Sequence, residues 1–316
     1  MSNGQNRHWA NVEEAGFVAG MRFLFFVYRA CGRWPFRFVL YPVLLWYMVT
    51  RPSSRKASRD YLCRIDRFSP IDTGLTGIIC HFRSFAETLL DKMLLWGGLY
   101  RTDEVVCHGV EDIERMIAGK RGALLICSHL GNLELCRVLS RRHAAIRLTI
   151  LVHTKHARAF NRMLARLNPD STLDLVQVTE MTPHTAMLLS RKVEAGEFVV
   201  IAGDRIPVSI NPQVATADFL GDQAAFPVGP YILAGALQCP IYLLFSIQRN
   251  GRPEVHFELL RESVKLPRKG RSEALLPLVT DYAVRLQHYC LQAPLQWFNF
   301  YDFWHLSRLE STDASR

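Results

Sequence analysis

The sequence predicts an α/β protein: one domain built on a mixed, mostly parallel sheet flanked by helices, preceded by a hydrophobic and amphipathic N-terminal helical element. Short apolar runs recur after residue 120, and such runs are typical of strands that are buried on both faces. Segments with apolar residues at helical spacing alternate with these runs, as expected for strands joined by crossover helices. A third observation, the density of large apolar residues before residue 50, predicts the N-terminal element.

Each predicted element follows from its own pattern. Charge-free runs of five to seven residues predict strands at 123–127, 148–152, 198–202 and 241–247. Helical spacing of apolar residues predicts helices at 73–99, 157–167, 185–194, 231–237 and 275–290.

The charge of the chain is concentrated at one end. The sequence has 38 Lys and Arg against 29 Asp and Glu, a net charge of +9, and 49% apolar residues. This composition excludes a disordered polyelectrolyte and a polytopic membrane protein. The first 70 residues hold 11 basic and four acidic side chains, so most of the net charge lies there. These basic residues alternate with Leu, Phe and Val and form no nucleic-acid-binding motif, which excludes nucleic acid as the partner.

The N-terminal apolar segment is interrupted too often to cross a bilayer comfortably. Its longest charge-free run, residues 38–50, is 13 residues long, whereas a spanning helix needs about 20. Arg29, Arg33 and Arg37 precede this run, so a single span requires these side chains to snorkel. Two helices that break near 32–35 and lie in the interface fit better, with the arginines on lipid phosphates. The alternative is an amphipathic pair packed on the protein's own core.

These features predict the organisation and location of the protein. We expect membrane-associating helices over 1–50, the α/β domain over 51–308 and a flexible tail over 309–316. No small-residue cleavage site follows the apolar run, so we expect the domain on the cytoplasmic face of the membrane. Eight cysteines without a C-x-x-C pair indicate reduced thiols rather than disulfides or a zinc site. His153 and His156 lack a third ligand at a suitable spacing, so we expect no metal.

A histidine and a glutamate follow the predicted strand 123–127. Functional groups collect beyond the carboxyl ends of strands in open α/β sheets, and His129 lies there, followed by Gly131 in a turn. In one continuous helix Glu134 would lie about 140° around from His129. The pair therefore meets only if His129 is in the turn and Glu134 on a helix. The carboxylate would then accept the imidazole N–H and leave the other ring nitrogen to take a proton.

Two other interpretations of this segment remain open. His129 can be a hydrogen-bonded capping residue without chemistry. Cys127 or Ser128 can be a nucleophile beside His129, although the G-x-S-x-G elbow typical of such a nucleophile is absent from the sequence.

Three further blocks accompany this segment. Gly203-Asp204-Arg205 follows the predicted strand 198–202, and FLGDQAAFPVGPYILA occupies residues 219–234. Pro294-Leu295-Gln296-Trp297 opens a cluster of six aromatic residues over 297–304, for which we expect a place in the core, with lipid contact as the alternative.

Together with HLGNLE at 129–134 and the Arg-rich aromatic N-terminus, these blocks resemble the bacterial lipid A late acyltransferases (lauroyl/myristoyl type), within the lysophospholipid acyltransferase superfamily. HLGNLE is a version of the H-x4-D/E signature of that superfamily, and the resemblance covers roughly residues 15–305. The segment 153–158 and the ending QWFNFYDFW look more like the acyltransferases of bacterial polyene-lipid and related glycolipid pathways.

The resemblance implies transfer of a fatty acyl chain from a thioester of acyl carrier protein, or of coenzyme A, to a hydroxyl of a lipid A-like or polyene-lipid-like acceptor. His129 would be the general base and Glu134 its orienting partner, and no cofactor is implied because the thioester is already activated. The implied substrate-binding residues are Gly131, Asn132, Asp204, Arg205 and Arg158. Amides near Gly131, or Arg205, would stabilise the oxyanion, and Asp204 would organise the site.

The resemblance also implies partners and a location. The partners are the acyl carrier protein and a phospholipid surface, and the location is the bacterial inner membrane. Arg158 either lies on a solvated face or contacts the acidic surface of the carrier protein. Two alternatives remain open: a non-catalytic membrane-associated scaffold with the same fold, and a hydrolase that uses the same histidine and releases free fatty acid.

Overall fold

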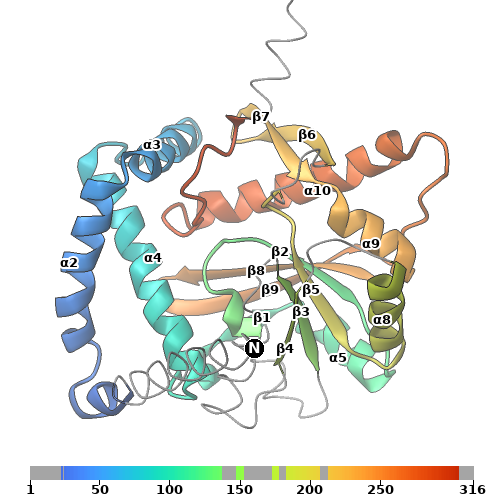
Figure 1. The fold of residues 1–316 in the computed structure, drawn as a ribbon, viewed down its shortest axis with the longest axis horizontal. Coiled ribbons are helices and arrows are strands. Elements are labelled where there is room, and N and C mark those ends of the chain that lie inside the picture. Colours follow the sequence, from blue (N-terminus) through green and yellow to red (C-terminus); the bar gives the residue numbers. More distant parts are fainter. Residues whose placement is uncertain are drawn as a thin grey trace, which may run out of the picture.

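The computed structural model describes residues 23, 25–136, 147–152, 173–177, 183–206 and 213–305. A seven-stranded sheet with helices on both faces forms its centre, which confirms the predicted α/β class (Figure 1). The strand order is β1-β9-β8-β2-β5-β3-β4, and β8 and β9 are the antiparallel pair in a sheet whose other neighbours are parallel.

The structure confirms the four predicted strands and contains five more that the apolar runs did not predict. The main sheet contains β1 Val106–His108, β2 Leu124–Cys127, β3 Leu148–Val152, β4 Leu173–Gln177, β5 Phe198–Ala202, β8 Ile241–Arg249 and β9 Arg252–Arg261. A separate hairpin contains β6 Val214–Phe219 and β7 Asp222–Pro227. Both unpredicted hairpins close on two residues with positive φ, Leu220-Gly221 and Asn250-Gly251. Such tight turns match the twist of the strands they join.

The helices agree with the apolar periodicity where the structure describes them. They are α2 Trp34–Thr50, α3 Pro52–Asp66, α4 Leu75–Trp96, α5 Val110–Ala118, α8 Pro183–Glu194, α9 Gly229–Leu237 and α10 Arg271–Gln292, with short 3-10 helices η1 Thr102–Glu104 and η2 Leu133–Cys136. The predicted helix 157–167 lies outside the described residues. The predicted N-terminal break is present at Gly32, whose φ of +70° ends one helical segment before α2 begins.

Two apolar cores cover the two faces of the sheet. Side chains of α3, α4, α8, α9, α10 and the β6–β7 hairpin pack on one face, around residues such as Leu124 and Phe245. Side chains of α5 and η2 pack on the other face, around Leu125 and Phe257. Because successive strand residues point to opposite faces, Leu124 and Leu125 of the same strand belong to different cores.

Helix α2 lies on the outside of α4, as Figure 1 shows. Arg33 forms an ion pair of 2.7 Å with Asp91, and Arg37 one of 2.6 Å with Glu87, both on α4. These two arginines therefore bind the protein itself, whereas the sequence interpretation placed them on lipid phosphates. No helix in the described part of the chain is both long and apolar enough to cross a membrane.

A buried histidine joins α4 to the segment 293–304, which we call the C-terminal strap. His81 is 1% exposed, with Nδ1 2.9 Å from Ser58 Oγ and Nε2 2.9 Å from the Trp297 carbonyl oxygen. A carbonyl can only accept, so Nε2 carries the proton and donates it, while Nδ1 accepts from the Ser58 hydroxyl. Both contacts therefore use the neutral ring, and burial lowers the pKa of His81 to about 4.

We expect this histidine to make the fold sensitive to acid. The unfolded ring takes up a proton below its ordinary pKa of 6.5, whereas the folded ring does not until about 4. Stability is therefore fully present above pH 6.5 and is lost as the pH falls toward 4, by up to ~3 kcal/mol. Urea unfolding of the wild type and of His81→Gln over this pH range measures the effect. The variant should show the shallower pH dependence, and parallel curves would contradict the assignment.

Candidate functional site

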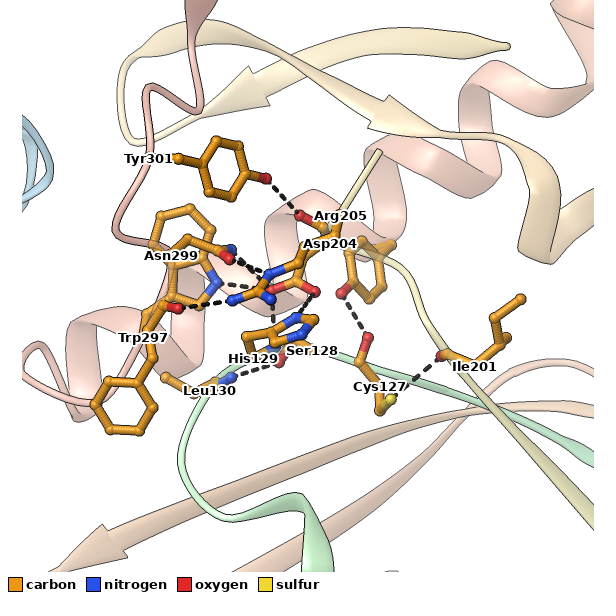
Figure 2. Close-up of polar contacts among 12 residues, drawn as sticks. Cys127, Ser128, His129, Leu130, Ile201, Asp204, Arg205, Trp297, Asn299 and Tyr301 are labelled. Carbon is orange, nitrogen blue, oxygen red and sulfur yellow. Dashed lines mark hydrogen bonds and ion pairs between the residues drawn. The ribbon is translucent and has the colours of Figure 1, made fainter. Parts of the chain in front are cut away.

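The candidate site lies where β2 and β5 end. These strands are parallel neighbours, with Cys127 of β2 opposite Ala202 of β5, so their carboxyl ends meet at one edge of the sheet. His129 follows β2 and Asp204 follows β5, and the Gly203 N–H donates to the Cys127 carbonyl over 2.8 Å. Two residues that are 75 positions apart in the chain are thereby placed side by side (Figure 2).

His129 and Asp204 are joined by two hydrogen bonds. The His129 Nδ1 lies 2.8 Å from Asp204 Oδ1, and the His129 backbone N–H donates to Asp204 Oδ2 over 2.8 Å. The Asp204 side chain is 0% exposed, whereas that of His129 is 32% exposed. The pair thus has a buried carboxylate and an imidazole that solvent or a substrate can reach.

The C-terminal strap supplies two further donors to the carboxylate. The Trp297 indole N–H and the Asn299 amide donate to Asp204 Oδ2 over 3.0 and 3.1 Å. Burial by itself would raise the pKa of Asp204, but the charge and hydrogen bonds of His129 together with the Trp297 N–H outweigh it and lower the pKa. Asp204 is therefore ionised, and the proton on the His129 ring sits on Nδ1.

The other ring nitrogen of His129 is directed away from this pair. Within the described residues, no hydrogen bond to the His129 Nε2 is found, and the partly exposed ring can present this nitrogen to a substrate. A neutral imidazole with its Nδ1 proton held by a carboxylate has a lone pair on Nε2. This is the arrangement of a general base.

The strap also holds the backbone of the turn 128–131 that carries His129. The Phe298 N–H donates to the His129 carbonyl over 2.9 Å, and the Gly131 N–H donates to the Gln296 carbonyl over 2.8 Å. Leu130 and Trp297 form an antiparallel bridge between these two bonds. Most of the aromatic cluster is core, as expected, since Trp297, Phe298, Phe303 and Trp304 are at most 6% exposed, whereas Tyr301 is 41% exposed. The hydrogen bond from the Trp297 indole to Asp204 was not predictable from the sequence.

The structure places Glu134 in η2, five residues beyond His129. Its backbone N–H donates to Asn132 Oδ1 over 3.2 Å. The sequence interpretation expected Glu134 to accept the hydrogen bond of the His129 Nδ1–H, but Asp204 Oδ1 accepts it instead. The spacing alone could not show this, because the contact depends on which strand lies beside β2.

The other predicted site residues differ in burial and in their hydrogen-bond partners. Asn132 is 6% exposed, and its Nδ2 has no hydrogen-bond partner among the described residues. Arg205 donates to Asn299 Oδ1 over 2.9 Å and to the Phe298 carbonyl over 3.0 Å, so it clamps the strap. Arg158 lies outside the described residues, as do His153 and His156.

The nucleophile interpretation has little support from the geometry. The Cys127 thiol is buried and donates to the Ile201 carbonyl over 3.3 Å. Burial raises the pKa of Cys127 well above its ordinary value, which disfavours the reactive thiolate. Ser128 is 2% exposed, and its hydroxyl accepts the Leu130 N–H.

The fold and the site define an α/β protein with a buried carboxylate–histidine pair at the carboxyl edge of its sheet. Residues 95–298 match the family model described as bacterial lipid A biosynthesis acyltransferase, which covers more than half of the chain. The protein belongs to this family, which implies acyltransferase activity in lipid biosynthesis. A search of curated proteins found no match.

Gly131 has two reasons to be glycine, and they can be separated. Its φ is +62°, and a Cβ there would lie 2.0 Å from the Ser246 carbonyl oxygen. Gly251 has a φ of +75° with nothing within 4 Å of its Cβ position. We expect Gly251→Ala to cost only the backbone strain, about 1 kcal/mol, and Gly131→Ala to cost clearly more because the turn must move off β8. Urea unfolding of both variants measures this, and equal losses would contradict the close approach.

Proposed function

We propose that the protein transfers a fatty acyl chain from an acyl carrier protein thioester to a hydroxyl of a lipid or glycolipid at a membrane surface. His129 is the general base and Asp204 the residue that orients it. The observation that carries this proposal is the His129 Nδ1–Asp204 Oδ1 hydrogen bond of 2.8 Å beneath a partly exposed ring, in a chain of the lipid A biosynthesis acyltransferase family. Asp204 takes the orienting function that the motif spacing suggested for Glu134.

The reaction follows from the protonation state of the pair. The His129 Nε2 takes the proton of the acceptor hydroxyl as its oxygen attacks the thioester carbonyl carbon. The resulting imidazolium is stabilised by the Asp204 carboxylate and then returns the proton to the sulfur as the carbon–sulfur bond breaks. The products are the new ester and a free thiol, so no further reactant or covalent enzyme intermediate is needed.

Asn132 is the described residue best suited to stabilise the oxyanion. The Gly131 N–H is bonded to Gln296, and two N–H groups of Arg205 are bonded to the strap. The Asn132 Nδ2 is instead a buried donor without a partner among the described residues, a state that costs about 1–3 kcal/mol. A donor left unpaired in the resting protein suits a group that is satisfied by the substrate.

Helix α2 supports attachment to a phospholipid surface. Nine of its large apolar side chains are exposed, among them Trp34 at 66%, Phe38 at 76% and Trp46 at 68%. Basic side chains flank the helix, with Arg29 before it and Arg51 after it. Apolar surface next to positive charge is typical of helices that lie in the interface of an anionic bilayer. We therefore place the domain beside the membrane that contains its acceptor, at the cytoplasmic face of the bacterial inner membrane.

The proposed functions of His129 and Asp204 predict different activities for three variants. We expect His129→Ala to abolish acyl transfer and Asp204→Asn to reduce kcat by about 10²-fold or more, because the amide no longer holds the productive tautomer. Glu134→Gln should have a smaller effect than Asp204→Asn. The measurement is transfer of a labelled acyl chain from acyl carrier protein, or from coenzyme A, into the lipids of bacterial membranes.

The outcomes of this assay also test the alternatives. Full activity of His129→Ala would overturn the mechanism, and a greater loss in Glu134→Gln than in Asp204→Asn would return the orienting function to Glu134. Label released as free fatty acid without an acceptor would indicate a hydrolase. Intact vesicle binding without any transfer by the wild type would indicate a scaffold.

Attachment through α2 can be tested with a matched pair of valines. Val43 on α2 is 56% exposed and Val284 on α10 is 57% exposed. Val43→Glu puts a charge on the proposed lipid-facing surface, and we expect it to weaken binding to phosphatidylglycerol-containing vesicles by roughly 10-fold or more. Val284→Glu should bind as the wild type does. Equal binding of all three proteins in vesicle co-sedimentation would argue against this surface.

A further inference from the structure

Three metal-ligating side chains meet at an edge of the sheet that the acyltransferase chemistry does not use. His108 is on the short edge strand β1, and Glu254 and His256 are on β9. The parallel register places His108 opposite His256, and Glu254 is two residues before His256, on the same face of the sheet. In the strand order, β8 separates β9 from β2, which leads to His129.

The distances from the Glu254 carboxylate to the two histidines fit one tetrahedral ion. The Glu254 Oε2 lies 3.5 Å from the His108 Nε2 and 3.2 Å from the His256 Nε2, and one ligand atom from each residue lies within 4.8 Å of the others. Ligands at 2.0–2.1 Å from a tetrahedral Zn²⁺ are separated by roughly 3.3 Å. We propose that His108, Glu254 and His256 bind one zinc ion through these three atoms, with the fourth position open to solvent.

Arg249 orients the Glu254 carboxylate for metal binding. The Arg249 Nε holds the other carboxylate oxygen, Glu254 Oε1, at 3.0 Å and so leaves Oε2 for the ion. Such outer contacts orient the ligands of metal sites.

One local adjustment is needed on binding. The rings of His108 and His256 are stacked, with centroids 4.4 Å apart and an angle of 13° between their planes, so their nitrogen lone pairs lie in nearly parallel planes and do not converge on one point. His256 is buried and also packs against Tyr289, whereas the His108 side chain is 45% exposed. His108 can therefore turn about its Cβ–Cγ bond to direct Nε2 at the ion without disturbing the core.

Binding at this place would fasten an edge strand. Strand β1 has three residues and pairs with β9 along one side. The site formed by β1 and β9 is present only in the folded state. An ion that binds there therefore stabilises the fold, and the gain in stability increases with the ion concentration. The inferred function is structural and stands apart from the proton transfer proposed at His129.

The test is zinc binding to chelator-treated protein, compared between two histidine variants. We expect wild-type protein titrated with ZnCl₂ in a calorimeter to bind one ion more tightly, by at least ~10-fold, than His108→Ala does. Zinc should also raise the melting temperature of the wild type by more than that of the variant. His288→Ala, which removes an exposed histidine from α10, is the matched control and should bind as the wild type does.

Cobalt distinguishes this site from the cysteines. Co²⁺ bound by two imidazoles and a carboxylate shows visible bands without a thiolate charge-transfer band, and we expect these bands in the wild type but not in His108→Ala. Equal zinc affinity of the wild type and His108→Ala would overturn the proposal. A thiolate band that carries all of the bound cobalt would overturn it as well.

Discussion

The buried carboxylate of Asp204 is the constraint on which the site depends. An isolated charge at a position with no solvent exposure costs several kcal/mol, so it persists only when donors surround it. Here the donors are the His129 N–H and ring, the Trp297 indole and the Asn299 amide. They come from the β2 turn and the C-terminal strap, so the carboxylate is satisfied only when the strap has closed over the turn. The position of the chain end and the arrangement of the His129–Asp204 pair are therefore coupled.

The C-terminal strap connects the Asp204 site to the N-terminal helices. Trp297 donates to Asp204 with its side chain and accepts from His81 of α4 with its carbonyl. Helix α4 in turn holds α2 through the Arg33–Asp91 ion pair. The proposed membrane-facing helix and the turn that carries His129 are thus both connected to α4. This arrangement fixes the partly exposed His129 ring relative to the proposed membrane-facing surface.

The sequence was sufficient to predict those strands and helices whose apolar pattern lies within one continuous segment. The runs of β2, β3, β5 and β8 and the helical spacing of α4, α8, α9 and α10 were predictable because buried strands and amphipathic helices impose their periodicity on a single stretch. Strand β9 was missed because charged residues such as Glu254 and Glu258 interrupt its apolar positions. Its Asn250-Gly251 turn, whose two residues have positive φ, was the available signal.

The sequence by itself determined the fold class, the place of His129 after a buried strand and the family, because each depends on residues that are close together or on ordered blocks. Only the tertiary structure decided which carboxylate meets His129. Asp204 and Glu134 both follow the histidine, but the pairing of β2 with β5 brings Asp204 to Nδ1. For the same reason His108 and His256, which are far apart in the chain, lie opposite each other only in the sheet. Strand order is a long-range property, set by packing rather than by spacing.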